Sequence, residues 1–387
     1  MKVPFVDLKA QHNEVRDEII SAVTDIIDNS SFVGGPRVER FEKDFAEFCG
    51  VKFAAGCANG TDALKLALMA AVVGPGDEVI TVSHTFVATA EAILLVGAQP
   101  VFIDIDHKRY TMDSQKLKQF LEGTTSIQNS ETVNIKTGKR IGAILPVHLY
   151  GLTADMAPLL KLAHEYHIPV IEDACQAHGA LCHINGENHR AGSLGLCGAF
   201  SFYPGKNLGA MGEAGAVVTN SEQANKDIHT WRDHGQSERY HHISPLGWNG
   251  RLDAMQAAIL RIKLKKLDEW NNRRRQAALW YKEKLSGIDE ILLPQGFEDA
   301  EHVYHLFVVR VKSRDSIQRR LAEQGVTTGL HYPIPIHLQQ GFRYLGYKKG
   351  DLPITEEVAE NVLSLPMYPH ITEEQVEYVC QELKKCV

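Results

Sequence analysis

The chain has 387 residues, of which 44% are hydrophobic and 23% are charged, and its formal net charge is −7. This composition is typical of a folded protein with a sizeable core, and it excludes a disordered or membrane-embedded chain. The acidic balance and the absence of a basic patch argue against nucleic acid as a partner.

Apolar periodicities alternate between helical and strand patterns through much of the chain. Helices are expected at 12–27, 38–48, 61–73, 86–95, 113–121 and 155–166, and strands at 78–82, 100–104, 141–147, 169–172, 198–202 and 214–218. The polar stretch 123–140 is expected to be a surface excursion between strands. Such alternation predicts the α/β class, with a mostly parallel central sheet covered by helices.

A long helical pattern at 252–285 links this part to a smaller one. The smaller part is expected to hold a strand at 304–311 and helices at 314–324 and 373–385. The sequence therefore predicts a large domain at 1–250, which includes the N-terminal helices, and a linking helix with a small α+β domain at 251–387.

The seven cysteines are scattered, and no two of them form a C-x-x-C pair. That pattern favours reduced thiols and a cytoplasmic protein. The first residues, Met1-Lys2-Val3-Pro4, lack the apolar segment of a secretory signal. Cys175 and His178 lie close together, but further ligands at zinc spacing are missing, so no metal is expected.

Lys206 follows a buried strand pattern and stands in a glycine-rich loop, Tyr203-Pro204-Gly205-Lys206-Asn207-Leu208-Gly209. Three interpretations are open: a solvated surface cation, a phosphate-binding lysine and an amine that forms a Schiff base. The P-loop spacing fails, because Phe200 stands where the first glycine should be and Asn207 follows the lysine. The Schiff-base interpretation needs partners elsewhere in the chain.

Candidate partners occur where an apolar strand pattern ends in Glu172 and Asp173. At the carboxyl end of a parallel strand, Asp173 would face a ligand crevice. A carboxylate there keeps a pyridine nitrogen protonated, as pyridoxal phosphate chemistry requires, although the same residue could cap a helix. Gln176 could donate to the phenolic oxygen of that cofactor or complete a capping box.

Two further segments carry candidate cofactor contacts. Gly60 and Thr61 open a helix whose free N–H groups and dipole would hold a phosphate, although the same pattern suits an ordinary capped helix. Phe86, in His84-Thr85-Phe86, could stack on a planar ring or belong to the core.

Taken in order, five segments resemble the motifs of the DegT/DnrJ/EryC1/StrS sugar aminotransferases: Gly60-Thr61, His84-Thr85-Phe86, Glu172-Asp173-Ala174-Cys175-Gln176, Ser201-Phe202-Tyr203-Pro204-Gly205-Lys206-Asn207 and Trp248-Asn249-Gly250-Arg251-Leu252. The resemblance extends from Phe5-Val6-Asp7-Leu8 to Pro366-Met367-Tyr368-Pro369, which is nearly the whole chain. It implies the aspartate-aminotransferase-like fold of pyridoxal 5'-phosphate enzymes, fold type I, with the cofactor held by the large domain.

The resemblance also implies a role for each site residue. Lys206 would bind the cofactor as a Schiff base, Asp173 would pair with the pyridine nitrogen, and Gln176 would bind the ring hydroxyl. Phe86 would stack on the ring. The implied phosphate ligands are Gly60, Thr61, Ser201 and, from the other subunit of a homodimer, Asn249.

For the substrate, the resemblance implies transfer of an amino group from an amino acid, such as glutamate, to a nucleotide-linked keto-sugar. The sequence of these motifs is most similar to that of family members that aminate C3 of a dTDP-keto-deoxyhexose, in polysaccharide or antibiotic biosynthesis. His331, Tyr332 and Arg251 would line the sugar or diphosphate site, although two prolines after Tyr332 also suit a rigid connector. The alternatives are a 4-keto-sugar or aminocyclitol aminotransferase, a non-catalytic regulatory homologue and a sugar 3-dehydrase. The last two are disfavoured by the presence of Lys206.

Overall fold

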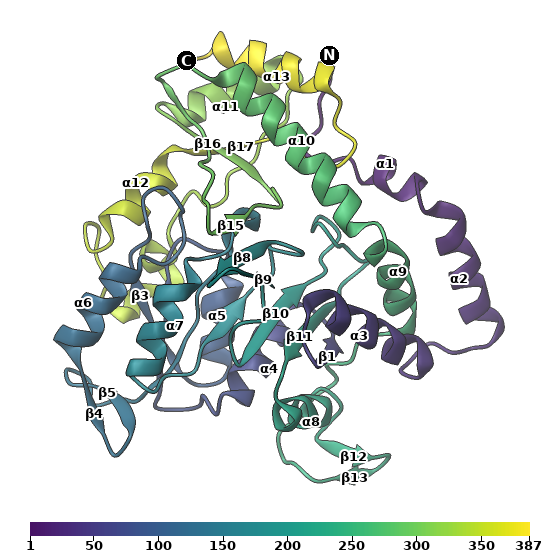
Figure 1. Ribbon diagram of the computed structural model, residues 1–387, viewed down its shortest axis with the longest axis vertical. Coiled ribbons are helices and arrows are strands. Elements are labelled where there is room, and N and C mark those ends of the chain that lie inside the picture. The colour runs from purple at the N-terminus through teal and green to yellow at the C-terminus, as the bar shows by residue number, and fades with distance from the viewer.

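The computed structural model describes all 387 residues, and its centre is a twisted sheet (Figure 1). A four-stranded group has the order β1 (Phe53–Cys57), β11 (Gly215–Thr219), β10 (Cys197–Ser201) and β7 (Ile171–Asp173). A three-stranded group has the order β3 (Gln99–Ile103), β2 (Glu78–Val82) and β6 (Ile141–Ile144). Parallel bridges from Ile144 to Val170 and from Val147 to Asp173 join β6 to β7, so the two groups form one surface. Only β11 runs antiparallel to its neighbours.

Helices cover this sheet as the α/β pattern predicts. They are α3 (Pro36–Cys49), α4 (Gly60–Ala70), α5 (Ala88–Leu95), α6 (Ser114–Thr124), α7 (Met156–Glu165) and α8 (Glu222–Trp231). α4 packs on β10 and β11, and α3 packs on β1. The bounds of α3 follow from its sequence: Pro36 stands at its first position, and Gly50 ends it with a left-handed φ of 71°.

Two of the expected helices are each divided in the structure. The N-terminal one is α1 (Leu8–Asn13) and α2 (Arg16–Asp28), and the linking one is α9 (Ala254–Leu264) and α10 (Leu267–Leu285). The first division falls at Val15, which is only 1% exposed and packs with Ile259 and Trp270. Tertiary packing of that side chain therefore overrides the helical periodicity that predicted one continuous helix.

The excursion at 123–140 is at the surface as expected, but it is an ordered hairpin. Its strands are β4 (Thr125–Gln128) and β5 (Glu131–Asn134). The two turn residues, Asn129 and Ser130, both have positive φ, 50° and 67°. Two positive φ values are typical of the tight turn that suits the twist of a hairpin.

A three-stranded antiparallel sheet forms the C-terminal region, in the order β14 (Ile291–Leu292), β16 (Phe307–Val311) and β17 (Val362–Leu365). Its apolar core includes residues of α10, α11 (Arg314–Glu323) and α13 (Glu373–Lys384). Val3 pairs with Val326, so the first residues return to this region, and Figure 1 shows both termini at the same end of the molecule.

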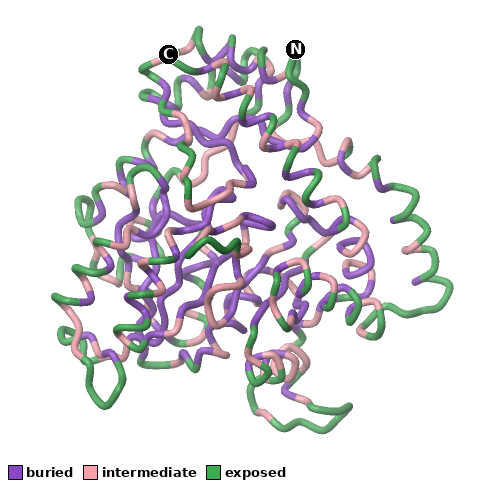
Figure 2. The backbone as a smooth tube through the Cα atoms, in the orientation of Figure 1, coloured by how far each residue is buried: buried purple, intermediate pink, exposed green.

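Several short elements were not expected from the sequence, β1 and α8 among them. The others are β8 (Leu181–Ile184), β9 (Glu187–Arg190), β12 (Gln236–Glu238), β13 (His241–His242), β14, β15 (Ala300–Glu301), α12 (Pro353–Asn361), β17 and the 3-10 turns Leu149–Gly151, Ile336–Leu338 and Gln340–Leu345. Figure 2 shows that the central strands are buried, whereas α2 and the β12–β13 hairpin are mostly exposed. None of the helices combines the length and apolar character that crossing a bilayer demands.

Candidate active site

A cavity of about 1000 Å³ opens at the carboxyl ends of β2, β7 and β10, beside the N-terminus of α4. This is the edge of a parallel sheet where ligands bind in open α/β folds. Nine of the eleven candidate residues line it: Gly60, Thr61, Phe86, Asp173, Gln176, Ser201, Lys206, His331 and Tyr332. Segments far apart in the sequence therefore meet at one site.

β10 delivers Lys206 to this cavity. Phe200 and Phe202 project from one face of the strand and meet Phe45 of α3 edge to face, with ring centroids 5.1 and 5.2 Å apart. Because strand side chains alternate between faces, Ser201 points the other way, towards α4. The buried aromatic contacts fix the strand end from which the Lys206 loop departs.

The amine of Lys206 lies in a partly enclosed environment, and its side chain is only partly exposed. Burial lowers the pKa of Lys206, and electrostatic interactions with Cys175 and Asp173 oppose that effect. A lowered pKa increases the neutral fraction of the amine, and only the neutral amine is a nucleophile or a base. The structure thus places Lys206 in the cavity, in a setting suited to Schiff-base chemistry.

Asp173 is held in a fixed orientation at the end of β7. Its Oδ2 accepts a hydrogen bond of 2.8 Å from Thr89 Oγ1, and its Oδ1 accepts one of 3.2 Å from the Cys175 N–H. Thr85 Oγ1 lies 2.9 Å from Thr89 Oγ1 and completes the chain of hydroxyls. Thr89 was not identified from the sequence, because its role depends on a contact between α5 and β7.

The helix-capping alternatives for Asp173 and Gln176 are wrong, because no helix begins after β7. Gln176 instead accepts a hydrogen bond of 2.9 Å from the Tyr150 N–H through Oε1. Its Nε2 donates to the Tyr332 hydroxyl over 3.0 Å. The amide retains a second N–H on Nε2, so it can donate to a ligand in the cavity as well.

The N-terminus of α4 provides an anion site. Asn59 caps the helix by accepting the Asp62 N–H over 2.8 Å, which leaves the N–H groups of Gly60 and Thr61 without an intrahelical acceptor. A side chain at position 60 would stand 2.5 Å from Ser201 Cβ, so only glycine permits this close approach. Two N–H groups, the helix dipole and the hydroxyls of Thr61 and Ser201 together suit a phosphate.

Phe86 and Tyr332 form one wall of the cavity. Phe86 is 54% exposed, which is unusual for a phenylalanine, and its ring centroid lies 5.8 Å from that of Tyr332. Its face is therefore free to stack on a planar group, and the interpretation of Phe86 as a core residue is wrong.

Two histidines lie near Lys206: His331, which the sequence singled out, and His305, which it did not. Asn207 donates through Nδ2 to Asn271 and to the Val303 carbonyl, so its Oδ1 must accept from Nδ1–H of His305, 3.2 Å away. Burial and the charge of Lys206 lower the pKa of His305 well below its usual value. The same two causes lower the pKa of His331 to about 4. The site therefore holds neutral imidazoles around the amine at neutral pH.

Acidification should destabilise the protein through its buried histidines. Burial lowers the pKa values of His84, His178 and His302 to about 3. Below about pH 6.5 these rings bind protons in the unfolded chain but stay neutral in the native state. The free energy of unfolding is therefore highest above pH 6.5 and decreases as the pH falls. Each such ring contributes a loss of about 1.4 kcal/mol per pH unit near pH 5, and the lowered pKa values of His305 and His331 add to the same trend, which urea unfolding between pH 7 and 5 measures.

The variant His302→Asn provides the control for this prediction. Nδ1 of His302 accepts the Tyr304 N–H over 2.8 Å, and the asparagine oxygen can accept the same bond without titrating. The variant should lose the contribution of one ring, about 1.4 kcal/mol per pH unit near pH 5, and a stability that does not change between pH 7 and 5 would contradict the prediction.

Asn249 and Arg251 do not line the cavity of their own chain. Asn249 is exposed, and its backbone pairs with that of Asp233 beyond the end of α8. Arg251 forms an ion pair with Asp233. The structure therefore separates these two from the other nine candidates. A position outside the chain's own site is what a contribution to a neighbouring subunit requires.

The residues present fit pyridoxal 5'-phosphate on the observations above. Gly60 opens a cradle that a Cβ would fill, and the anion site lies in the same cavity as an exposed aromatic face, a carboxylate and an amine. Gly60, Thr61 and Ser201 would hold the phosphate, Phe86 the ring face, Asp173 the pyridine nitrogen and Lys206 the aldehyde carbon. No group of three or more His, Cys, Asp or Glu side chains is arranged to hold a metal ion.

Comparison with known proteins identifies relatives of the chain as a whole. A model of the DegT/DnrJ/EryC1/StrS aminotransferase family matches residues 13–384. The chain is 42% identical over 383 residues to the UDP-N-acetyl-3-dehydro-alpha-D-glucosamine 3-aminotransferase of Acidithiobacillus ferrooxidans, covering 99% of this chain and 97% of that one. It is 40% identical over 374 residues to the dTDP-3-amino-3,4,6-trideoxy-alpha-D-glucose transaminase of Streptomyces venezuelae, covering 97% and 93%.

Among solved structures, the chain is similar to S. venezuelae DesV in complex with a ketimine intermediate. The TM-score is 0.91 at 40% sequence identity, and the match covers 99% of this chain and 98% of that one. The expected family resemblance and the α/β fold are confirmed by these matches.

Proposed function

Because this chain belongs to the DegT/DnrJ/EryC1/StrS aminotransferase family, we propose that it is a pyridoxal 5'-phosphate-dependent aminotransferase that converts a nucleotide-linked keto-sugar into an amino-sugar. The observation that carries this proposal is the meeting of Lys206, Asp173 and the α4 anion site in one cavity. A homologue that keeps the fold without catalysis needs no such amine, and the resemblance implies that a sugar 3-dehydrase would lack a lysine at this position.

Each residue has a task that follows from its surroundings. When bound, the cofactor supplies an electron-accepting ring for the bond changes at the amino-bearing carbon. Lys206 Nζ, whose pKa is lowered by burial, takes in its neutral form the proton from the α-carbon of the amino donor. In the opposite half-reaction it returns a proton to the sugar carbon that receives the amine. Asp173 stabilises positive charge at its ring partner, and Phe86 limits the access of water to one ring face.

The acceptor that we propose is C3 of a dTDP-keto-deoxyhexose, with glutamate as the donor. The support is the pair of relatives described above, both named for a 3-amino product or a 3-amino transfer. One of them takes a UDP-sugar by its name and the other a dTDP-sugar, so both nucleotides belong in the assay. His331 and Tyr332 lie in the cavity wall where a sugar would reach the amine.

Product analysis tests this proposal directly. The purified protein should show visible absorbance from bound cofactor, and L-glutamate alone should change that spectrum. Addition of a dTDP-3-keto-deoxyhexose or a UDP-3-keto-sugar should then yield the 3-amino-sugar, identified by mass and by NMR of the C3 proton. A spectrum that does not respond to any amino donor would favour a regulatory homologue, and amination at C4 would overturn the proposed position.

We also propose that the active protein is a homodimer with shared sites. Asn249 lies outside the cavity of its own chain and is exposed, which suits a phosphate contact to the neighbouring subunit. In a two-fold dimer such a contact is reciprocal, so two composite sites form. The cytoplasmic location and the domain division at residue 250 stay predictions.

Mixing two inactive variants tests the shared site. A dimer of one Lys206→Ala chain and one Asn249→Asp chain contains one site with both wild-type residues and one site with neither. Random exchange makes half of the dimers hybrids, so about one quarter of the wild-type activity should return. Either parent variant alone is the control. Mass spectrometry verifies that the subunits have exchanged. If no activity returns after that exchange, the shared site is contradicted.

A further inference from the structure

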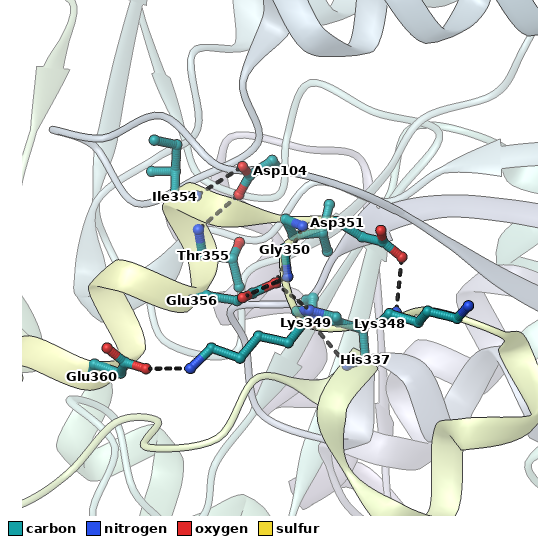
Figure 3. Close-up of polar contacts among 12 residues, drawn as sticks. Asp104, His337, Lys348, Lys349, Gly350, Asp351, Ile354, Thr355, Glu356 and Glu360 are labelled. Atoms are coloured by element: carbon teal, nitrogen blue, oxygen red, sulfur yellow. Dashed lines mark hydrogen bonds and ion pairs between the residues drawn. The ribbon is translucent and has the colours of Figure 1, made fainter.

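Ser83, His337 and Glu356 form a buried chain of hydrogen bonds behind the wall of the cavity. Ser83 Oγ lies 2.7 Å from His337 Nδ1, and His337 Nε2 lies 3.2 Å from Glu356 Oε1. Figure 3 shows Glu356 on α12 between His337 and Gly350, whose N–H it also binds at 2.8 Å. The three side chains come from the end of β2, from the connector that follows Tyr332, and from α12.

The direction of each hydrogen bond follows from the partners. Glu356 accepts the N–H groups of Gly350 and Leu352, so as a carboxylate it accepts Nε2–H of His337 too. His337 Nδ1 then carries a lone pair and accepts the hydroxyl proton of Ser83. Ser83 Oγ in turn accepts the backbone N–H of His337 over 2.9 Å. Each polar side chain in this series of hydrogen bonds therefore has a partner when the imidazole of His337 carries a single proton, on Nε2.

This order of residues resembles a serine-histidine-acid nucleophile, but the structure excludes that activity. Ser83 is 0% exposed and His337 is 1% exposed, so no substrate reaches the hydroxyl. The role of this chain of hydrogen bonds is therefore to position the segments that it connects.

What it connects are the two aromatic residues of the cavity wall. Phe86 stands three residues after Ser83, and Tyr332 stands five residues before His337. The Ile336 N–H also donates to the Ser83 carbonyl over 3.1 Å. Between Tyr332 and Ile336, Pro333 and Pro335 have no N–H to anchor the connector.

A second tether fixes the other end of the connector. His84 Nε2 lies 2.7 Å from the Tyr150 hydroxyl, which donates to the His331 carbonyl. The adjacent residues Ser83 and His84 thus hold the connector on both sides of Tyr332. From this arrangement we infer that Ser83, His337 and Glu356 are positioning residues that set the spacing of Phe86 and Tyr332, and with it the fit of the sugar substrate.

Two substitutions of His337 separate its two hydrogen bonds. In His337→Asn the amide stands near the place of Nδ1, so it keeps the bond to Ser83 and loses the bond to Glu356. In His337→Gln the amide stands near the place of Nε2, so it keeps the bond to Glu356 and loses the bond to Ser83. Of the two side-chain hydrogen bonds of His337, only the bond to Ser83 ties the connector to the segment between β2 and α5 that carries Phe86, so the two variants should differ.

The readouts are hydrogen-deuterium exchange of residues 329–338 in the cofactor-loaded protein and the kinetics with the keto-sugar. His337→Gln and the smaller change Ser83→Ala should raise exchange in this segment and raise KM for the sugar about tenfold, with kcat changed less than about threefold. His337→Asn should stay within about threefold of wild type in both. Absorbance of the bound cofactor should be unchanged in all three.

A matched control loosens α12 without touching this chain of bonds. Asp104 accepts the N–H groups of Ile354 and Thr355 at 3.0 and 2.8 Å, at the start of the helix in Figure 3. Asp104→Asn should lower the melting temperature and leave exchange in 329–338 unchanged. The inference is overturned if Asp104→Asn reproduces the change in exchange and KM, or if His337→Asn and His337→Gln are equally affected.

The inference rests on the proposed function only for the sugar kinetics. If no keto-sugar is turned over by the wild-type protein, the proposed function fails, while the exchange of residues 329–338 still decides whether Ser83 and His337 position the connector.

Discussion

Replacement of Lys206 by alanine is expected to lower turnover by about 10⁴-fold or more while the fold stays intact. The lysine is both the nucleophile that would hold the cofactor and the base that moves the proton, so its loss removes two contributions at once. Its side chain is only partly buried, and the aromatic contacts of Phe200 and Phe202 that fix the strand do not depend on it. Single-turnover absorbance with L-glutamate measures the loss, and the melting temperature verifies the fold.

A second lysine with a lowered pKa, Lys263, allows the assignment of Lys206 to be tested by chemical labelling. Burial lowers the pKa of Lys263 to about 8, so its amine is also partly neutral near pH 7.5. Lys263 lies on α9, however, where its Nζ donates to the Gly209 carbonyl and does not line the cavity. Borohydride reduction of the loaded protein, followed by peptide mapping, should label Lys206 alone. A label on Lys263 would show that a lowered pKa is enough for reaction with the cofactor outside the cavity. That result would contradict the assignment of Lys206 as the cofactor-binding residue.

The parts of the site that the sequence predicted are those with a local signal. Lys206 stands between glycines after an apolar strand, Asp173 ends a strand, and Gly60 opens an apolar helix. Each of these patterns depends on fewer than about ten consecutive residues, and the parallel sheet then brings strand ends together. The cavity contains all three because these strand and helix ends meet at one edge of the sheet, although the boundaries of several elements differ from those expected.

The parts that the sequence could not predict depend on contacts between distant segments. Thr89 supports Asp173 from α5, and His305 meets Asn207 from the segment just before β16. A threonine within a helix or a histidine before a strand has no distinguishing local pattern. The division at Val15 was missed for the same reason, because only the packing against Ile259 and Trp270 reveals it.

Replacement of Asp173 by asparagine is expected to lower turnover at least about a hundredfold, because a neutral amide no longer stabilises a protonated pyridine nitrogen. The hydrogen bonds around the residue can adapt. An asparagine oxygen can accept the Cys175 N–H, while the hydroxyl of Thr89 can rotate to accept from the new NH₂ group. The fold should therefore persist, and the effect should come from the missing charge.

The variant Thr89→Val separates the charge of the Asp173 carboxylate from its orientation. The variant removes the 2.8 Å hydrogen bond to Asp173 Oδ2 and keeps the carboxylate, so it should cost about 1 kcal/mol, or roughly fivefold in turnover. The absorbance and fluorescence of the bound cofactor report the protonation of its ring independently of turnover. They should change in Asp173→Asn and stay close to wild type in Thr89→Val. If Asp173→Asn binds the cofactor and turns over within about threefold of wild type, the carboxylate is not the partner of the ring nitrogen, and another group in the cavity must hold that proton.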